Sequence, residues 1–122
     1  MHGVGLRTLP GNILRLVRGT IASRRILKDF RPDVLLFTGG YVAVPMAVAA
    51  RPYKSLLYVP DIEPGLALRV LARYSDRIAL TAEDSRKYFD NPAITDVTGY
   101  PTRPDLSDWT RKSGREKLGL TD

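Results

Sequence analysis

The sequence predicts an α/β fold in which a parallel sheet is built from strands joined by crossover helices. Short, continuously apolar runs alternate with segments of helical periodicity, and few residues separate one from the next. This alternation is typical of a parallel sheet with helices packed on it. At 122 residues the chain is long enough to bury one core.

Four runs are predicted to be strands, at residues 33–38, 55–59, 77–81 and 94–99. The first, DVLLFT, is apolar almost throughout, as expected of a strand that is buried on both faces. The fourth, ITDVTG, is more polar. No glycine fingerprint for a dinucleotide accompanies these strands, so the expected fold is Rossmann-like without a predicted nucleotide site.

Five segments are predicted to be helices, at residues 11–30, 42–50, 64–74, 83–89 and 107–118. In the first, an apolar face recurs at helical spacing opposite two arginines, Arg15 and Arg18. Its members are Ile13, Leu14, Val17 and Ile21. In the third, Pro64 suits the first helical turn, and Leu66, Val70 and Leu71 are predicted to face inward.

Composition excludes several kinds of site. The chain has no cysteine and a single histidine, His2, so no disulfide, thiolate metal site, histidine metal site or cofactor is expected. The longest apolar stretch, Val42 to Ala50, is too short to span a bilayer, and no signal peptide pattern opens the chain. A cytoplasmic location is therefore predicted.

The net charge of +6 resides in the first 31 residues, which hold seven basic side chains and one acidic side chain. The other 91 residues carry twelve of each sign and cancel. A basic segment beside a neutral domain suggests an anionic partner, either lipid headgroups or nucleic acid. A solvated helix face is the alternative.

Ligands of parallel sheets bind beyond the carboxyl ends of the strands, which draws attention to the loops at 38–42, 59–65, 81–84 and 99–104. Gly39 and Gly40 could let the backbone approach an anion at the following helix, or could serve only a tight turn. Asp61 and Glu63 could act as a base, bind a metal or accept hydrogen bonds from sugar hydroxyls, or could simply be solvated. Arg103, between two prolines, could pair with a phosphate.

Taken together, several runs resemble the MurG-type glycosyltransferases, glycosyltransferase family 28, which have the GT-B architecture. The runs are RRILKDFRPDVLLFTGGYVAVP, PGLALRVLARYSDRIAL and VTGYPTRPDL. The resemblance implies that residues 1–106 are part of an N-terminal, acceptor-binding Rossmann-like domain. Residues 107–122 would then be a linker and the start of a C-terminal donor-binding domain. The family transfers GlcNAc from UDP-GlcNAc to undecaprenyl-diphospho-muramoyl-pentapeptide in peptidoglycan synthesis.

The resemblance also implies roles for individual residues. The family loop GGYVSGP corresponds to residues 39–45 here, and it is thought to receive the acceptor's diphosphate. The acceptor-binding residues would be Gly39, Gly40, Tyr41 and Val42. The family turn GNPVR corresponds to residues 99–103, which makes Arg103 a donor-side residue.

The sequence departs from the family pattern in three places. Where the family usually has HEQNAVPG, residues 58–65 read YVPDIEPG, leaving Asp61 as the candidate base and Glu63 as an acceptor-binding replacement. Another lipid-linked or glycolipid acceptor is therefore an alternative. The family's first glycine loop, with its proposed catalytic histidine, and its donor-binding domain have no counterpart here, so this chain alone is expected to bind rather than catalyse.

The expected partners follow from the same resemblance. They are a UDP-sugar donor held mainly by a further domain, a lipid-diphosphate acceptor, and an anionic inner membrane face met by Arg15, Arg18 and Arg25. Open sheet edges could also allow self-association. A nucleic-acid or regulatory binding module is the alternative function, but aromatic residues do not interleave with the basic ones, and no nucleic-acid partner is predicted.

Overall fold

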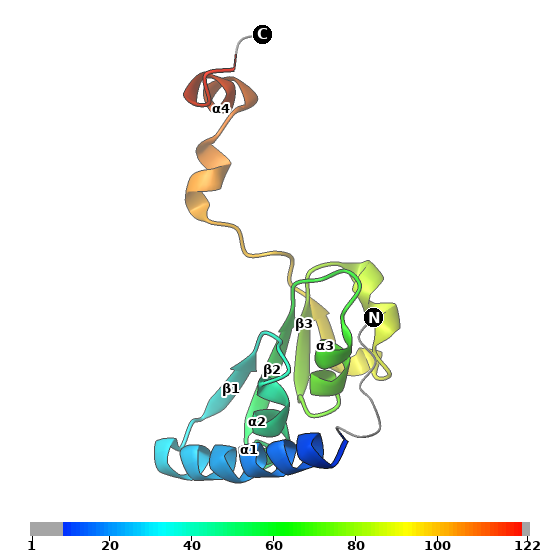
Figure 1. Ribbon diagram of the computed structural model, residues 1–122. Coiled ribbons are helices and arrows are strands. Elements are labelled where there is room, and N and C mark those ends of the chain that lie inside the picture. Colours follow the sequence, from blue (N-terminus) through cyan, green and yellow to red (C-terminus); the bar gives the residue numbers. More distant parts are fainter. Residues whose placement is uncertain (1–8, 121–122) are drawn as a thin grey trace.

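The computed structural model describes the backbone of residues 9–120 and the side chains of residues 11–105 and 108–120 (Figure 1). It contains four α-helices, four strands and three short 3-10 helices in this range. In chain order they are α1 (Leu9–Phe30), β1 (Val34–Phe37), α2 (Ala43–Ala49), β2 (Lys54–Val59), α3 (Leu66–Ala72), β3 (Arg77–Leu80), η2 (Glu83–Tyr88), η3 (Pro92–Ile94), β4 (Thr95–Val97), η4 (Pro104–Asp108) and α4 (Arg111–Lys117).

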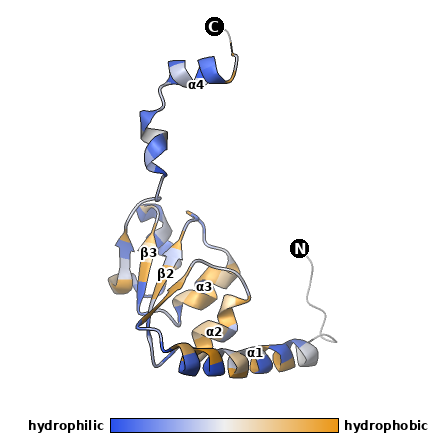
Figure 2. Cartoon of the chain, turned by 90° about the vertical axis from the view of Figure 1, so that its left-hand side faces the viewer, coloured by the Kyte–Doolittle hydropathy of each residue, from blue (hydrophilic) through white to orange (hydrophobic). Residues whose placement is uncertain are grey.

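The strands form one parallel sheet in the order β1-β2-β3-β4, which confirms the predicted α/β fold. Leu36 lies opposite Leu56, and Leu57 lies opposite Ile78. All four predicted strands are present, although the fourth is confined to Thr95–Val97. Because successive strands are neighbours and run the same way, right-handed connections place their helices on the same face. Figure 2 shows α2 and α3 together on one side of the sheet.

The core lies between this face and the helices. Leu57 and Leu80 from the sheet and Leu71 from α3 are completely buried, and Phe37 is 5% exposed. The facing residues of α2 are small, and Ala47 is completely buried. Small side chains let α2 approach the sheet closely, so the large residues come mainly from the strands.

Three predicted helices need correction. α3 begins at Leu66 with Gly65 as its N-cap, so Pro64 lies before the helix, and Leu66 is 66% exposed while Leu68 and Leu71 are buried. The helix predicted at 83–89 is the 3-10 helix η2. The helix predicted at 107–118 is divided into η4 and α4, because Thr110 and Ser113 form a capping box that starts α4 at Arg111.

The apolar face of α1 does not pack on the core. The four residues that form it, Ile13, Leu14, Val17 and Ile21, are between 46% and 58% exposed. The buried side of the helix is instead marked by Ser23 and Leu27. Gly19 lies on this side as well, since a Cβ built there would be 3.1 Å from the Pro45 ring on α2. Small residues four apart therefore decide which side of α1 packs on α2.

In residues 9–120, no helix combines the length and apolar character needed to cross a bilayer. Nor do the described residues include a group of three or more histidine, cysteine or acidic side chains placed to hold a metal ion. His2 lies outside the described residues.

Candidate functional site

The four loops that follow the strands lie at the carboxyl ends of the strands. Hydrogen bonds join the ends of β2, β3 and β4 there. Thr81, just after β3, donates to the carbonyls of Val59 (2.8 Å) and Pro60 (3.2 Å) at the end of β2. Thr98, after β4, donates its amide to Leu80 O at 2.9 Å. The exits of β2, β3 and β4 are thereby held side by side, as expected for a ligand-binding edge.

The glycine loop after β1, residues 38–42, is open to solvent. Tyr41 is 71% exposed and Val42 is 91% exposed. Gly39 and Gly40 have φ values of +121° and +84°, conformations that side chains rarely adopt. A Cβ on Gly39 would also lie 3.3 Å from Leu68 Cδ2, whereas a Cβ on Gly40 would meet nothing within 4 Å. At Gly39 the glycine is required by the tight turn and by the close approach of the Leu68 side chain, which joins this loop to α3.

The backbone amides that are available to an anion at this loop differ from those expected. The amides of Ala43 and Val44, in the first turn of α2, already bond to Gly40 O and Tyr41 O, each at 3.2 Å. Among the described residues, none accepts a hydrogen bond from the amides of Gly40, Tyr41 or Val42. An anion at this position would therefore meet loop amides rather than the helix terminus.

The acidic loop after β2 presents two exposed carboxylates, Asp61 and Glu63. Neither carboxylate forms a hydrogen bond or ion pair with another described residue. The backbone is held, however, because the buried Ser85 hydroxyl donates to Asp61 O at 3.4 Å. The loop is fixed while its charged groups remain available to a ligand.

Arg103 is not brought to the same place by any described contact. It lies on the segment that leads from β4 away from the sheet towards η4 (Figure 1), and its side chain is 78% exposed. Its guanidinium is 3.9 Å from the Asp105 carboxylate. The donor-side role of Arg103 remains a prediction.

Thr81 and Ser85 are positioning residues that the sequence analysis missed. They fix the acidic loop through its carbonyls, and Ser85 is completely buried although it lies in a polar 3-10 helix. Tyr58 contributes as well, with its hydroxyl 3.4 Å from Thr81 Oγ1. The sequence places Thr81 at the end of the predicted strand 77–81 and Ser85 in the predicted helix 83–89, and only contacts across the sheet give their hydroxyl groups a role.

The opposite, amino-terminal end of the strands is closed by internal hydrogen bonds. Ser55 donates its amide (2.8 Å) and its hydroxyl (3.0 Å) to Asp76 Oδ2, and Lys54 Nζ is 3.7 Å from Asp76 Oδ1. The Ser55 amide hydrogen bond is the largest cause that lowers the pKa of Asp76, followed by the Ser55 hydroxyl. This cluster joins β2 to the start of β3.

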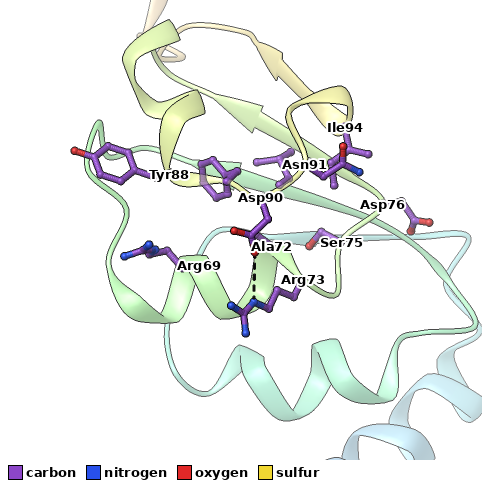
Figure 3. Close-up of a pocket in the computed structure, with 11 residues that line it drawn as sticks. Arg69, Ala72, Arg73, Ser75, Asp76, Tyr88, Asp90, Asn91 and Ile94 are labelled. Atoms are coloured by element: carbon purple, nitrogen blue, oxygen red, sulfur yellow. Dashed lines mark ion pairs between the residues drawn. The ribbon is translucent and has the colours of Figure 1, made fainter.

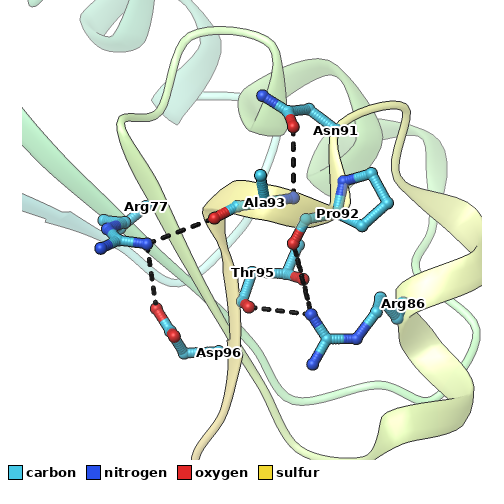
Figure 4. A network of polar contacts seen from close by, with 7 residues as sticks. All are labelled: Arg77, Arg86, Asn91, Pro92, Ala93, Thr95 and Asp96. Carbon is cyan, nitrogen blue, oxygen red and sulfur yellow. Dashed lines mark hydrogen bonds and ion pairs between the residues drawn. The ribbon is translucent and has the colours of Figure 1, made fainter.

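A second network fixes the crossover to β4 (Figure 4). Arg86 donates to the carbonyl of Thr95 at 2.9 Å and to its hydroxyl, which in turn donates to Pro92 O at 2.6 Å. Arg86 also bonds to Glu83 Oε1 at 2.6 Å, which lowers the pKa of that carboxyl and raises the pKa of Arg86.

A cavity of about 480 Å³ lies between α3 and the η2–η3 segment (Figure 3). Apolar residues such as Ile78 and Phe89 line it, and the Arg73–Asp90 ion pair at 3.9 Å lies beside it. It contains none of the predicted site residues and opens near the amino-terminal ends of the strands. It is separate from the loops described above.

A parallel sheet with exposed glycine and acidic loops at the strand exits defines a Rossmann-like α/β domain. Residues 2–80 match the glycosyltransferase family 28 N-terminal domain, and the chain therefore belongs to this family. The predicted family is confirmed.

Two curated relatives illustrate the similarity. A protein of Alkaliphilus metalliredigens is 37% identical over 108 residues, covering 87% of this chain and 30% of the relative. A protein of Desulforudis audaxviator is 38% identical over 112 residues, covering 90% and 30%. Both are named UDP-N-acetylglucosamine--N-acetylmuramyl-(pentapeptide) pyrophosphoryl-undecaprenol N-acetylglucosamine transferase. The chain thus spans about 30% of the length of these relatives.

The fold is also found in a solved structure. The crystal structure of Acinetobacter baumannii MurG superposes with a TM-score of 0.64 at 22% identity, covering 77% of this chain and 28% of that one. This likeness confirms the predicted fold, that of part of the N-terminal half of a GT-B protein.

Proposed function

We propose that the chain is the acceptor-side part of a hexosyltransferase that moves GlcNAc from UDP-GlcNAc to a lipid-linked diphosphate acceptor. The names of the relatives state this reaction for those proteins. The observation that carries the proposal is the exposed glycine loop, whose amides from Gly40 to Val42 bond to no described residue. Backbone amides of this kind can bind a diphosphate. The departure from the family at residues 58–65 keeps a different glycolipid acceptor as the alternative.

The diphosphate site is tested with geranyl diphosphate, a short soluble lipid diphosphate. Binding should shift the NMR signals of the Gly40–Val42 amides, and geraniol, which lacks the diphosphate, should not. Gly40→Ala should weaken binding about tenfold or more, because a side chain at φ +84° disturbs the loop. Gly119→Ala is the matched control, since Gly119 also has positive φ (+66°) but lies after α4. Equal loss of binding in the two variants would refute the site.

In the transfer step we assign Asp61 as the general base and Glu63 as a hydrogen-bond acceptor for acceptor hydroxyls. The Asp61 carboxylate takes the proton of the attacking hydroxyl, the new C–O bond forms at the anomeric carbon, and UDP leaves with the electrons of the broken bond. Both side chains are exposed at a strand exit and carry no internal partner among the described residues. This arrangement supports the assignment.

Measuring that role needs an enzyme competent for transfer that contains this chain and the donor-binding part. Asp61→Asn should lower kcat by about 100-fold or more, the usual contribution of a general base. Glu63→Gln should mainly raise KM for the acceptor. Near-normal turnover with Asp61→Asn would remove Asp61 from the mechanism.

We further propose that α1 docks this domain on the cytoplasmic face of the membrane. Its exposed apolar face offers aliphatic side chains to the lipid. Arg18 and Arg25 follow Leu14 and Ile21 by four residues, so both lie at the border of that face, and Arg18 is not opposite it as expected from the sequence. Arg15 is also exposed. The close contact of Gly19 with Pro45 joins α1 to the helix that follows the glycine loop. A docked α1 would therefore keep the diphosphate site near the membrane that carries the acceptor.

Vesicle sedimentation separates the apolar and electrostatic contributions. Binding should be stronger to vesicles containing phosphatidylglycerol than to neutral phosphatidylcholine vesicles. Arg18→Gln and Arg25→Gln should each weaken binding to anionic vesicles about fivefold, corresponding to ~1 kcal/mol per basic residue. Val17→Glu should weaken binding to both vesicle types, whereas Arg111→Gln on α4 should change neither. Unchanged sedimentation of Val17→Glu would contradict docking through this face.

A further inference from the structure

The cavity of about 480 Å³ between α3 and the η2–η3 segment takes no part in the function proposed above. One wall is formed by the second half of α3 and the turn after it, and the other by residues 88–91 and Ile94. Ile78 of β3 also lines it. A volume of this size falls within the ~300–1,000 Å³ typical of pockets that hold small molecules. The cavity is therefore large enough for an organic ligand.

The buried part of the cavity lining is mostly apolar. Ile78 is 1% exposed, and Phe89 is 8% exposed. Ala72 and Ile94 are partly buried hydrophobic residues that pack against the core. Because Ala72 carries only a methyl group, the space beside α3 stays open at this position. A fixed apolar surface of this kind favours an aromatic or aliphatic group of a ligand, since binding removes apolar surface from water.

Four charged side chains line the cavity, and three of them have partners. Asp76 accepts two hydrogen bonds from Ser55, and Arg73 is 3.9 Å from Asp90. The guanidinium of Arg69 forms neither a hydrogen bond nor an ion pair with another described residue. The uncompensated charge of the cavity is therefore a single positive charge, which favours an anion.

The available donors gather at one end of the cavity. Figure 3 shows Arg69 and Tyr88 extending towards the same end, with Asp76 at the opposite end. The Tyr88 hydroxyl bonds to no described residue, and Lys87 Nζ is 5.3 Å from the centre of the Tyr88 ring, which adds positive charge near this end. A guanidinium can donate two parallel hydrogen bonds to a carboxylate or a phosphate. An anionic group is thus expected at the Arg69 end, away from Asp76.

We propose that the cavity binds a small organic anion, a carboxylate or phosphate monoester that carries an aromatic or aliphatic group. The anionic group pairs with Arg69, and the apolar group lies on Ala72, Ile78 and Phe89. An inorganic ion would leave this apolar surface in water, and a neutral apolar molecule would leave Arg69 unpaired. A molecule with both parts satisfies the two features together.

The site is distinct from the glycine loop but borders the elements that support it. The Leu68 side chain of α3 is 3.3 Å from a Cβ placed on Gly39, and Ser85 of η2 donates to Asp61 O. A ligand in the cavity would contact both α3 and the segment that follows η2. It would therefore stabilise the two elements that position these loops and leave the loops themselves accessible.

The test titrates the 122-residue chain with phenyl phosphate and with benzoate and follows binding by NMR. Both probes should shift signals from the two walls of the cavity, including the amides of Arg73 and Asn91. Phenol and inorganic phosphate each carry only one part of the ligand. Each should bind about tenfold or more weakly than phenyl phosphate, because it lacks one of the two contacts. The tighter of the two probes identifies the anionic group that Arg69 prefers.

Matched variants locate the binding site. Arg69→Gln should weaken binding of both probes about tenfold, whereas Arg24→Gln, at an exposed arginine of α1, should not. Ala72→Leu, which fills the cavity, should abolish binding. Ala93→Leu, at an exposed alanine outside the cavity, should leave binding unchanged.

The outcomes separate this site from the glycine loop. Inorganic phosphate that binds as tightly as phenyl phosphate, or unchanged binding in Arg69→Gln, overturns the proposal. Signals that move only at Gly40–Val42 also overturn it, because the phosphate would then occupy the glycine loop. Gly40→Ala should leave binding in the cavity unchanged, so the result is independent of the proposed function.

Discussion

The two ends of this sheet use their polar groups in opposite ways. At the amino-terminal end, Ser55 and Asp76 satisfy one another, and Arg86 and Thr95 close the crossover to β4. At the carboxyl end, the amides of Gly40–Val42 and the carboxylates of Asp61 and Glu63 bond to no other described residue. Both ends are rich in polar residues, so composition does not distinguish them.

The difference supports the proposed ligand site at the carboxyl end. A polar group that is bonded internally contributes to stability, whereas a fixed but unpartnered group remains available to bind. Ser85 and Thr81 make the carboxyl end rigid through its carbonyls and leave its side chains free. We therefore expect substitutions at the amino end to change stability without changing ligand binding.

The largest effect on stability is expected at Gly39, in the glycine loop at the carboxyl end of the sheet. Gly39→Ala places a side chain at φ +121° and a Cβ 3.3 Å from Leu68 Cδ2. The free energy of unfolding in urea should fall by about 1–3 kcal/mol. Gly40→Ala, with φ +84° and no neighbour within 4 Å, should lower it less. Equal losses would mean that contact with Leu68 does not matter.

Ser55→Ala should have the next largest effect and is the direct test of the closed end. The hydroxyl bonds to Asp76 and is 3.3 Å from Tyr74 O, and the residue is 5% exposed. Its loss should lower the free energy of unfolding by about 1–2 kcal/mol with unchanged binding of geranyl diphosphate. Ser75→Ala, which removes a single buried bond to Leu71 O, should cost less. Weaker ligand binding in Ser55→Ala would break the contrast between the two ends.

How far the sequence predicts this structure depends on the kind of interaction. The first three strands follow from apolar runs, because a strand buried on one or both faces needs such residues wherever it lies, whereas β4 lies in a more polar run. The packing side of α1 does not follow from apolar residues, since Gly19 and Ser23 are chosen for close approach to α2 and carry little hydrophobic signal. The Leu66 start of α3 was missed because Gly65 rather than Pro64 caps it.

The position of the candidate site in the fold was predictable from the sequence, but the hydrogen bonding of its groups was not. Alternating strands and helices placed Gly39, Gly40, Asp61 and Glu63 on one edge of the sheet. Which amides remain free could not be predicted, because that depends on the turn by which Ala43 and Val44 bond back to the loop. Ser85 was missed for a similar reason, as its partner belongs to another loop.

Thr95→Val should produce a smaller loss at the closed end. The hydroxyl donates to Pro92 O at 2.6 Å and accepts from Arg86, and the residue is 5% exposed. Thermal unfolding should report a loss of ~1 kcal/mol, the net value of one such hydrogen bond. Thr98→Val is the control, because Thr98 is exposed and its side-chain contacts are 3.5 Å long. A loss in Thr98→Val as large as in Thr95→Val would contradict the role given to this network.

The smallest effect should be a dependence on pH at Asp76, whose side chain is 44% exposed. Hydrogen bonds from Ser55 lower the pKa of this carboxyl below its ordinary value of 3.8, so folding favours the carboxylate. The stabilisation is present above that value and is lost as the pH falls through it towards the lower pKa of the folded state.

Asp76→Asn should therefore lower Tm at pH 7, and the difference from the unsubstituted chain should shrink below about pH 4. Lys54→Gln removes only a minor cause of the shift and should keep most of this pH dependence. Ser55→Ala removes the hydroxyl bond but keeps the backbone amide bond, the largest cause, so it should reduce the pH dependence only in part. A Tm difference between Asp76→Asn and the unsubstituted chain that stays constant from pH 7 to pH 3 would show that the Ser55–Asp76 bonds do not stabilise the closed end through the carboxylate.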